Sequence, residues 1–288
     1  MLLGALRRKL EQHVHNASIF FHFPPLKMPE LPEVEEAMQR LRAAVEGKTI
    51  TRVRTHHQAL ERQLPAATAR RLRQQKITRV ERRGKHQLIH LNNGSVLHAH
   101  FRMNGDWLMS RADEPLDKFS RASIELTDDS RIELHDSRAL SSLKLHPKGE
   151  NPLPKLGIEA NDTGLDAEYL RLALSKRKGP IKPTLMDQAV IAGLGNIYAA
   201  ESLWSAKISP RAVASSISRP RLAKLADAIH DVLEKEERAP GRYTDTENRD
   251  RFQVYDREGQ PCSRCGTKIK RIPQAGRSTY FCPTCQRS

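Results

Sequence analysis

A helical hydrophobic pattern follows the short polar segment Met28–Glu30. Its apolar residues recur three or four positions apart, which is typical of an amphipathic helix; they are Val34, Met38, Leu41 and Val45. Pro32 suits the first turn of such a helix, because its missing N–H would have no partner there. If Met28 is the initiator and is removed, Pro29 carries a free secondary amine next to the Glu30 carboxylate, a nucleophile beside a proton shuttle. The alternative is an ordinary capped helix start.

Short segments of alternating or continuously apolar residues follow up to residue 146. Two pairs of these segments flank the turn sequences Asn92-Asn93-Gly94 and Asp128-Asp129-Ser130, which favour β-hairpins. The predicted strands are residues 49–54, 76–81, 86–91, 95–101, 122–127 and 131–136. Strands at this spacing predict an antiparallel β-sandwich.

The second half of the chain has a helical pattern, with expected helices at 165–176, 183–188, 196–205 and 220–238. The predicted fold class is therefore α+β. The expected divisions are an extension that is disordered or precedes the true start (1–27), a sandwich domain with flanking helices (28–146), a linker (147–160), a helical domain (161–238), a connecting loop (239–258) and a metal-binding β-hairpin (259–288).

The charge balance favours a polyanionic partner. The chain has 49 Lys and Arg against 34 Asp and Glu, a net charge of +15 and a pI near 9.9. Nucleic acid fits this excess better than a membrane, because no long apolar segment or amphipathic anchor is present. A merely basic protein is the alternative.

All four cysteines lie near the C-terminus, as two Cys-x-x-Cys pairs: Cys262, Cys265, Cys282 and Cys285. This spacing predicts a closed tetrahedral Zn²⁺ site with a structural role, since no position remains for water. Disulfides and an iron–sulfur cluster are the alternatives. Residues 267–272 and 278–281 between the pairs are expected to form a hairpin with residues 273–277 at its tip, where Arg277 would offer its guanidinium to a phosphate.

Several of these sequences, in this order, resemble the formamidopyrimidine-DNA glycosylase family, whose members excise oxidised bases from DNA. The similar stretches are MPELPEVE at 28–35, AGLGNIY at 192–198 and the cysteine-containing C-terminus. The resemblance implies a helix–two-turn–helix domain followed by a zinc finger. It also implies catalytic roles for Pro29 as nucleophile, Glu30 as proton shuttle and Lys85 as a contact to the sugar or phosphate near the lesion.

The resemblance further implies a set of DNA contacts. Met103 and Leu140 would fill the gap left by an everted base, Arg138 would address the orphaned partner base, and the phosphate contacts would be Lys182, Asn196 and Arg277. Asn196 is also expected to cap its helix and leave amide groups free for a phosphate. Leu140 departs from the family, which has an aromatic residue at this position. The 237–254 segment is short, so a preference like that of endonuclease VIII for oxidised pyrimidines stays open.

The implied reaction is glycosylase and abasic-site lyase chemistry through a Schiff base on Pro29, followed by β,δ-elimination. An amide nitrogen cannot attack carbon, so this chemistry requires Pro29 to be the N-terminus. With residues 1–27 attached, a non-catalytic zinc-finger protein that binds damaged DNA is the alternative; a zinc-ribbon RNA-binding protein is a more remote one. The expected partner is damaged double-stranded DNA, with no membrane, for a monomer that is not secreted and works at the bacterial nucleoid in the cytoplasm.

Overall fold

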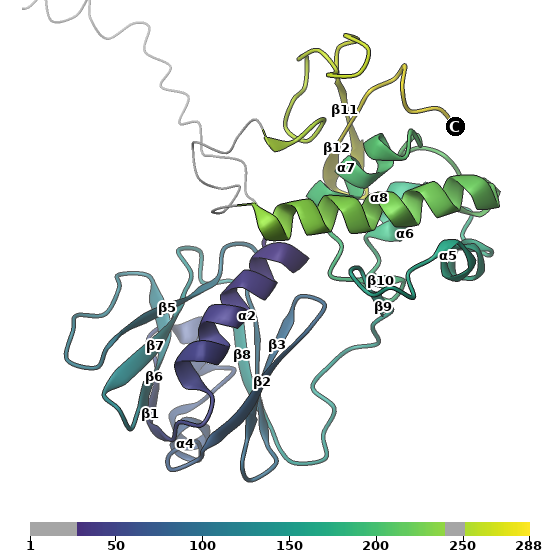
Figure 1. Ribbon diagram of the computed structural model, residues 1–288. Coiled ribbons are helices and arrows are strands. Elements are labelled where there is room, and N and C mark those ends of the chain that lie inside the picture. Colours follow the sequence, from purple (N-terminus) through teal and green to yellow (C-terminus); the bar gives the residue numbers. More distant parts are fainter. Residues whose placement is uncertain (1–27, 240–250) are drawn as a thin grey trace, which may run out of the picture.

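Two domains joined by a long segment make up the protein (Figure 1). The computed structural model describes residues 28–239 and 251–288. The prediction for residues 1–27, and most of the predicted connecting loop 239–258, lie outside the described residues. Helix α2 (Leu31–Val45) lies along the N-terminal domain and reaches α8 (Arg219–Arg238) of the C-terminal domain.

The N-terminal domain is an antiparallel β-sandwich, as predicted. One sheet has the strand order β1-β6-β7-β5 and the other β2-β3-β4-β8. The strands are β1 (Ile50–Thr55), β2 (Ile77–Arg83), β3 (His86–Leu91), β4 (Val96–His100), β5 (Asp106–Arg111), β6 (Ser120–Leu126), β7 (Ser130–His135) and β8 (Ser142–His146). Strands β5 and β8 were not predicted. Two short helices, α3 (Gln58–Glu61) and α4 (Ala66–Arg70), follow β1.

Both predicted hairpins are present. Strands β3 and β4 pair across the turn at Asn92–Gly94, where Gly94 has a φ of +82°, and β6 pairs with β7 across Asp128–Ser130. The left-handed conformation at Gly94 explains why the sequence Asn-Gly marks this turn, because glycine adopts positive φ without steric cost.

The C-terminal domain is helical, and the four predicted helices are confirmed, the one at 196–205 with its predicted ends and the others with shifted ends. They are α5 (Ala167–Leu174), α6 (Ile181–Leu185), α7 (Asn196–Ser205) and α8, with a 3₁₀ turn η1 (Ala214–Ser216). Two short strands, β9 (Ile158–Glu159) and β10 (Ile191–Ala192), pair in parallel; β9 lies within the predicted linker.

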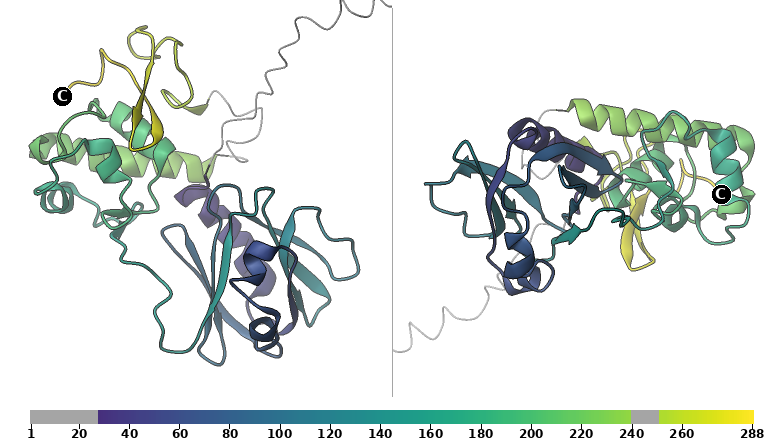
Figure 2. Two further views of the ribbon diagram at one scale, coloured as in Figure 1. Left: turned by 180° about the vertical axis from the view of Figure 1, so that it is seen from behind. Right: turned by 90° about the horizontal axis from the view of Figure 1, so that it is seen from below.

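Helix α2 belongs to two hydrophobic cores. Leu31 packs in the core of the C-terminal domain, while Val34, Met38 and Leu41 pack in the core of the sandwich. The start of α2 is therefore fixed at the junction of the domains, which the views from behind and from below also show (Figure 2). Residues Pro29 and Glu30 are held at that junction.

The C-terminal hairpin consists of β11 (Lys270–Gln274) and β12 (Arg277–Phe281). The predicted five-residue tip was wrong, because Pro273 pairs with Ser278 and Gln274 pairs with Arg277. The turn is formed by Ala275 and Gly276, both with positive φ, so Arg277 begins the return strand.

Among the described residues, no helix is both long enough and apolar enough to cross a membrane.

Candidate active site

The Glu30 carboxylate is bound to the N-terminus of α7. Its Oε1 accepts a hydrogen bond from the amide of Ile197 at 2.8 Å, and its Oε2 accepts one from the amide of Tyr198 at 3.3 Å. The first amides of a helix have no partner within the helix and carry the positive end of its dipole, so they favour a carboxylate. This contact joins residues 167 and 168 positions apart and fixes the side chain beside Pro29.

Two glycines make room for this approach. A Cβ on Gly195 would lie only 2.3 Å from the carboxyl carbon of Glu30, and a Cβ on Gly193 would lie 2.6 Å from a methyl group of Leu31. Gly193 also has a φ of +92°, and its carbonyl accepts a hydrogen bond from the Leu31 amide at 3.2 Å. The Gly-x-Gly sequence is therefore a docking surface for the start of α2.

The prediction for Asn196 needs a correction. Gly195 is the N-cap residue of α7, Asn196 is the first helical residue, and the amides expected to await a phosphate bind Glu30 instead. The Asn196 side chain donates a hydrogen bond to the Ser278 carbonyl at 3.2 Å and accepts one from Lys182 Nζ. It therefore ties the helical domain to the hairpin.

Burial changes the protonation of the groups around Glu30. Removal from water raises the pKa of Glu30, against the lowering effects of Lys85 and of the two α7 amides. Burial also raises the pKa of Glu33 to about 7. Glu33 accepts a hydrogen bond from the Glu30 amide at 2.9 Å and another from the Tyr198 hydroxyl. Both carboxyl groups at the start of α2 therefore bind a proton more readily than an exposed glutamate does.

Lys85 is buried, with 7% of its surface exposed, and lies in the same pocket. Desolvation lowers its pKa, whereas the negative charges of Glu30 and Glu33 raise it. A buried lysine of this kind has a larger neutral fraction than one in water.

The pocket over Glu30 has a volume of about 520 Å³ and is open on one side to solvent. It collects residues from both domains and from the hairpin. Among its lining residues are Met28, Glu30, Lys85, Met103, Leu140, Asn196, Tyr255 and Arg277. Six of the residues predicted from the sequence are therefore brought together: Glu30, Lys85, Met103, Leu140, Asn196 and Arg277. Pro29 lies between two lining residues, Met28 and Glu30.

Leu140 and Arg138 are exposed on a loop organised by Asp136. The buried Asp136 carboxylate accepts hydrogen bonds from the amides of Arg138 at 2.9 Å and Leu140 at 2.7 Å, and from the amide and hydroxyl of Ser141. The Ser141 hydroxyl lies 3.1 Å from the Phe101 carbonyl, two residues before Met103. The loops with Met103 and Leu140 are thereby coupled. Leu140 lines the pocket, while Arg138 lies outside it.

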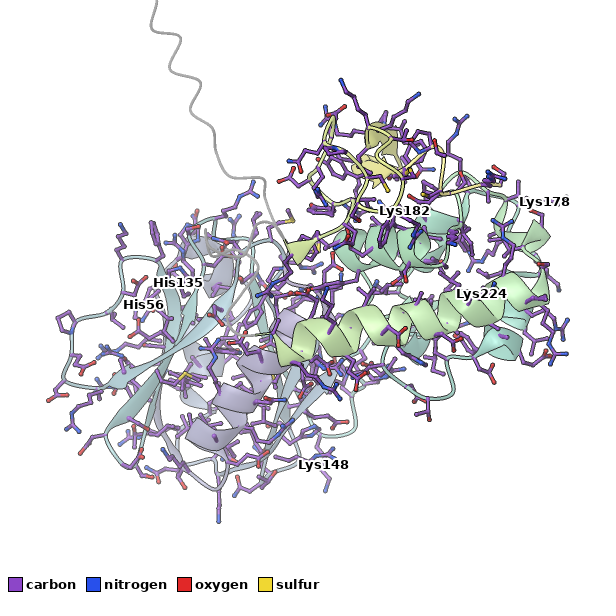
Figure 3. The ribbon with its side chains drawn as sticks, turned by 45° about the horizontal axis from the view of Figure 1, so that its top comes forward. His56, His135, Lys148, Lys178, Lys182 and Lys224 are labelled. Carbon is purple, nitrogen blue, oxygen red and sulfur yellow. The ribbon has the colours of Figure 1, made fainter. Side chains whose placement is uncertain are left out.

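Lys182 is almost completely buried beneath the hairpin (Figure 3). Its ammonium donates to the side chains of Asn196 and Thr279, the latter at 2.9 Å, and burial lowers its pKa to about 8. Lys182 does not line the main pocket; together with Arg277 it borders a smaller one. These hydrogen bonds hold the hairpin against α6 and α7.

Two arginines near Lys85 are engaged internally. Arg82 pairs with Glu35 at 2.6 Å and also with Glu159, and Arg83 pairs with Glu159. They link α2, β2 and β9 and thus hold the joining segment to the sandwich. Their basic charge is therefore not available to a phosphate, although the sequence places them beside Lys85.

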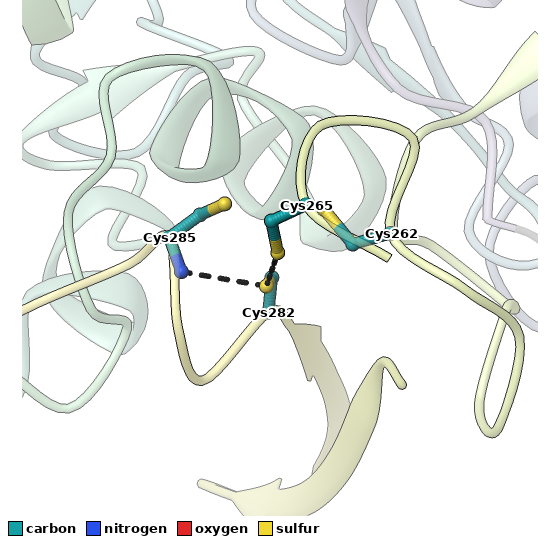
Figure 4. Close-up of side chains that lie close together, drawn as sticks. All are labelled: Cys262, Cys265, Cys282 and Cys285. Carbon is teal, nitrogen blue, oxygen red and sulfur yellow. Dashed lines mark hydrogen bonds between the residues drawn. The ribbon is translucent and has the colours of Figure 1, made fainter. Parts of the chain in front are cut away.

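The four cysteine sulfurs lie within 4.8 Å of one another (Figure 4). Cys265 Sγ and Cys282 Sγ are 3.5 Å apart. Four sulfurs bound to zinc at about 2.3 Å in a tetrahedron are separated by about 3.8 Å, so the observed cluster fits this ion. Four thiolates complete the coordination and leave no place for a substrate, so such an ion would stabilise the hairpin.

Sequence reasoning missed three residues that organise the site. Glu33 and Asp136 are buried acidic side chains that accept hydrogen bonds from backbone amides. The third residue, Tyr198, donates a hydrogen bond from its hydroxyl to Glu33. Asp136 had one usable signal, because an Asp that precedes a loop commonly binds the amides that follow it. The Glu30 amide is only three residues from Glu33, but its other partner, Tyr198, lies 165 positions along the chain and cannot be read from spacing.

Comparisons with known proteins cover most of the chain. The model of the formamidopyrimidine-DNA glycosylase N-terminal domain matches residues 28–143, the model of its H2TH domain matches 156–246, and that of the zinc finger found in FPG and IleRS matches 259–287. The zinc-finger match and the cysteine cluster together identify one structural zinc site.

Curated relatives match over their full length. The formamidopyrimidine-DNA glycosylase of Herpetosiphon aurantiacus is 37% identical over 272 residues, covering 90% of this chain and 100% of the relative. That of Erythrobacter litoralis is 38% identical over 276 residues, with the same coverage.

Solved structures of this family are also similar to the chain. MutM in complex with DNA containing carbocyclic 8-oxo-G has a TM-score of 0.82 and 31% identity, and Lactococcus lactis Fpg in complex with DNA containing an abasic site has 0.81 and 30%; each comparison covers 90% of this chain and 100% of the other. The chain, with its sandwich, its Glu30 pocket and its four-cysteine hairpin, therefore belongs to the formamidopyrimidine-DNA glycosylase family.

Proposed function

We propose that this chain, a DNA glycosylase of base excision repair, excises oxidised bases from duplex DNA and then cleaves the abasic strand, with the free amine of Pro29 as nucleophile. The observation that carries the residue assignment is the position of Glu30. Its carboxylate is fixed by the α7 amides, one residue from Pro29, in the pocket that also contains Lys85 and Arg277.

A terminal amine suits this task. An α-amino group with a pKa near 8 is roughly one-tenth neutral at pH 7, whereas an exposed lysine with a pKa of about 10.4 is neutral in less than roughly one molecule in a thousand. Pro29 therefore supplies a nucleophilic lone pair without deep burial. In a chain that continues before Pro29, the nitrogen is an amide and the reaction cannot start.

The reaction begins after the damaged nucleotide leaves the base stack. The Pro29 nitrogen bonds to C1′ as the glycosidic bond breaks. The base departs with the bonding electrons and takes up the proton that the Pro29 nitrogen loses. The C1′–O4′ bond then opens. Glu30 gives its proton to O4′ as this bond opens, and an iminium forms between Pro29 and C1′. Burial raises the pKa of Glu30 and so favours the protonated carboxyl group that this step needs.

The iminium accepts electrons in the elimination that follows. The Glu30 carboxylate removes a proton from C2′, and the electrons of that bond expel the 3′ phosphate. In a second elimination a proton leaves C4′ to solvent, and the electrons of that bond expel the 5′ phosphate from C5′. Water then hydrolyses the iminium and frees the Pro29 amine. Lys85 contacts the opened sugar or a neighbouring phosphate, and the structural zinc takes no part in these steps.

The DNA contacts are assigned from position and chemistry. Met103 and Leu140 present apolar side chains at the pocket, and Arg138 is exposed on the loop next to them. Arg277 from the hairpin and Asn196 from α7 line the pocket and are assigned to phosphates. Lys182, whose ammonium donates to Asn196, is assigned to the same phosphate contacts as a positive charge beside them. The proposed substrates are 8-oxoguanine and formamidopyrimidines. Because they lie in genomic DNA, the proposed place of action is the nucleoid, in the cytoplasm of a bacterial cell.

Borohydride trapping tests the proposal. A chain that begins at Pro29 should be captured covalently, through Pro29, on a duplex containing 8-oxoguanine; no adduct would refute the enzyme assignment. A Glu30→Gln chain should bind the lesion duplex normally while base release slows by at least roughly 10²-fold. Unchanged turnover would exclude Glu30 as the proton shuttle.

A non-catalytic damage-binding protein is the second candidate, and one observation favours it: in the 288-residue chain Pro29 follows Met28 and has no free amine. Mass spectrometry of the native N-terminus distinguishes the two. A terminus at Pro29 supports the enzyme, whereas the full chain alone supports the binding protein.

A further inference from the structure

Positive charge is concentrated in a part of the sandwich that the proposed function does not use. Residues 48–80 contain nine Lys and Arg and a single Glu, a net charge of +8 within 33 residues, out of +15 for the 288-residue chain. None of the assigned catalytic, DNA-contacting or zinc-binding residues lies in this stretch. Its charge therefore needs a separate explanation.

Three of these arginines converge on one groove. Helix α4 packs against the edge strand β1, and between them lies a groove of about 340 Å³ that contains Arg52, Arg70 and Arg73. We call these three residues and the space between them the basic groove. Helix α4 lies at the end of the sandwich opposite the C-terminal hairpin, as two opposed views show (Figures 1 and 2).

The charges in the basic groove are scarcely neutralised. Arg52 pairs with Glu125 at 3.6 Å, and its side chain stays 54% exposed. Within the part of the chain that the structure describes, Arg70 and Arg73 form no ion pair, and both are exposed. The neighbouring Arg54, Arg71 and Lys76 are also exposed. In contrast, Arg131 in the same domain is buried against Glu133 at 2.9 Å.

The chemistry of this surface selects among polyanions. Guanidinium groups bind phosphate oxygens in a bidentate manner. The large exposed hydrophobic residues of the described chain are Met109, Leu116, Leu140, Leu172 and Val213, and none lies in residues 48–80. An apolar anchor for a membrane or a hydrophobic centre for a protein interface is therefore missing from this stretch. A phosphodiester backbone needs neither of them.

We propose that the basic groove binds the backbone of a second DNA duplex while the first duplex occupies the pocket over Glu30. This inference rests on the proposed function, since it takes DNA as the partner. One duplex held at the domain junction and a second held at the far end of the sandwich allow the protein to pass from one duplex to another without complete release. Contacts limited to phosphates give this second site no sequence or lesion preference.

A two-colour capture experiment tests the inference with the full 288-residue chain. The protein is first saturated with an immobilised duplex that contains a reduced abasic-site analogue, and a labelled undamaged duplex is then added. Capture of the second duplex is expected, with a strong salt dependence. The triple variant R52Q/R70Q/R73Q should lower this capture at least tenfold and reduce the slope of log K against log salt by roughly 2.7, about 0.9 for each lost phosphate contact.

A matched control removes three positive charges elsewhere. R219Q/K224Q/K235Q changes exposed residues of α8 that form no ion pair with any described residue, and it should capture the second duplex within about twofold of the unchanged chain. An equal loss in both triple variants would show only a net-charge effect and would overturn the assignment. So would a wild-type complex that captures no second duplex.

Two further readouts complete the test. Vesicles of phosphatidylglycerol and phosphatidylcholine replace the second duplex in a parallel series, and stronger capture of vesicles than of DNA would overturn DNA as the occupant. Excision of 8-oxoguanine from a single duplex by R52Q/R70Q/R73Q, in a chain beginning at Pro29, should stay within about twofold of its parent. Failure of the second site is thereby distinguished from failure of the proposed function.

Discussion

Gly195 and Glu30 are in such close contact that no side chain fits between them: a Cβ on Gly195 would lie 2.3 Å from the Glu30 carboxyl carbon. Because Gly195 has no Cβ, the N-terminus of α7 can approach Glu30, the proposed proton shuttle, closely enough to bind it. The substitution Gly195→Ala should displace the Glu30 carboxylate from the amides of Ile197 and Tyr198. Because a displacement of about 1 Å can cost roughly 10²-fold in rate, excision by the Pro29-starting chain should fall by about that factor.

Single-turnover release of 8-oxoguanine measures this effect. Gly179→Ala is the control, because no atom of the described residues lies within 4 Å of a Cβ at that position and its φ is not positive. The control should excise at the parent rate. Normal excision by Gly195→Ala would mean that Glu30 does not need its position on α7.

Asp136 gives a second prediction, because its buried carboxylate holds the loop with Arg138 and Leu140. In Asp136→Asn one acceptor oxygen becomes an NH₂ donor that faces amide donors. Loss of a hydrogen bond to a buried charged group costs about 1–3 kcal/mol, so the free energy of unfolding should fall by that amount. Binding to an abasic-analogue duplex should weaken as well.

Urea unfolding and fluorescence anisotropy measure the two effects. Asp113→Asn is the control, since that side chain is 73% exposed and its one ion pair within the described residues is with Arg111, at the end of β5. It should change stability by less than about 0.5 kcal/mol. A stable Asp136→Asn protein with normal DNA binding would refute the role of this loop.

How far the sequence predicts this molecule depends on the range of each contact. The helix with Val34 and Met38, the turn at Gly94 and the paired cysteines depend on neighbours within a few positions, and all were predicted correctly. The position of Glu30 depends on amides 167 and 168 residues away, and no local pattern encodes it. The start of α7 illustrates the limit. The spacing of residues predicted a helix there, but it did not predict that the first amides of this helix bind the Glu30 carboxylate.

The ion pairs of the arginines were also not predictable from the sequence. Arg82 and Arg83 look like DNA contacts in the sequence, yet Glu159, more than 70 positions away, pairs with both. Arg70 and Arg73 look like ordinary surface residues, yet they share a groove with Arg52. Composition predicted a basic protein, but only the packing of α4 on β1 shows where that charge is concentrated.

Zinc removal gives a third prediction. The hairpin binds the helical domain through Thr279, which accepts a hydrogen bond from Lys182, and through Ser278, whose carbonyl accepts one from Asn196. Without the metal, the thiolates repel each other and the hairpin loses its constraint. Cys265→Ser should therefore contain less than one zinc per chain by elemental analysis and bind duplex DNA at least roughly tenfold more weakly.

The neighbouring Ser263→Ala is the control, because its exposed hydroxyl donates, among residues 28–239 and 251–288, only to the Gln253 side chain. It should retain one zinc and normal affinity. DNA binding by Cys265→Ser that equals that of the control would remove the hairpin from the DNA-binding surface.

A row of histidines beside the pocket makes stability depend on pH. His86 Nδ1 and His98 Nε2 are 2.9 Å apart, and His100 and His146 lie next to them, with ring centroids 4.8 Å from His86 and 5.6 Å from His98. Burial lowers the pKa of His98 to about 4, with further lowering by the positive charges of its histidine neighbours, Lys144 and Arg102. The unfolded imidazole, with a pKa near 6.5, therefore binds a proton before the folded one does.

This difference sets the sign of the pH effect. The neutral imidazole of His98 contributes stability that is fully present above pH 6.5 and is lost as the pH falls toward 4. The buried carboxyl groups of Glu30 and Glu33 have raised pKa values and act in the opposite direction, so the unchanged chain alone cannot isolate the effect.

The informative quantity is the difference in free energy of unfolding between the unchanged chain and His98→Gln. Between pH 7 and pH 5 this difference should move by about 2 kcal/mol against the unchanged chain. Urea unfolding at half-unit steps of pH measures it, and parallel curves for the two proteins would show that His98 titrates alike in the folded and unfolded states.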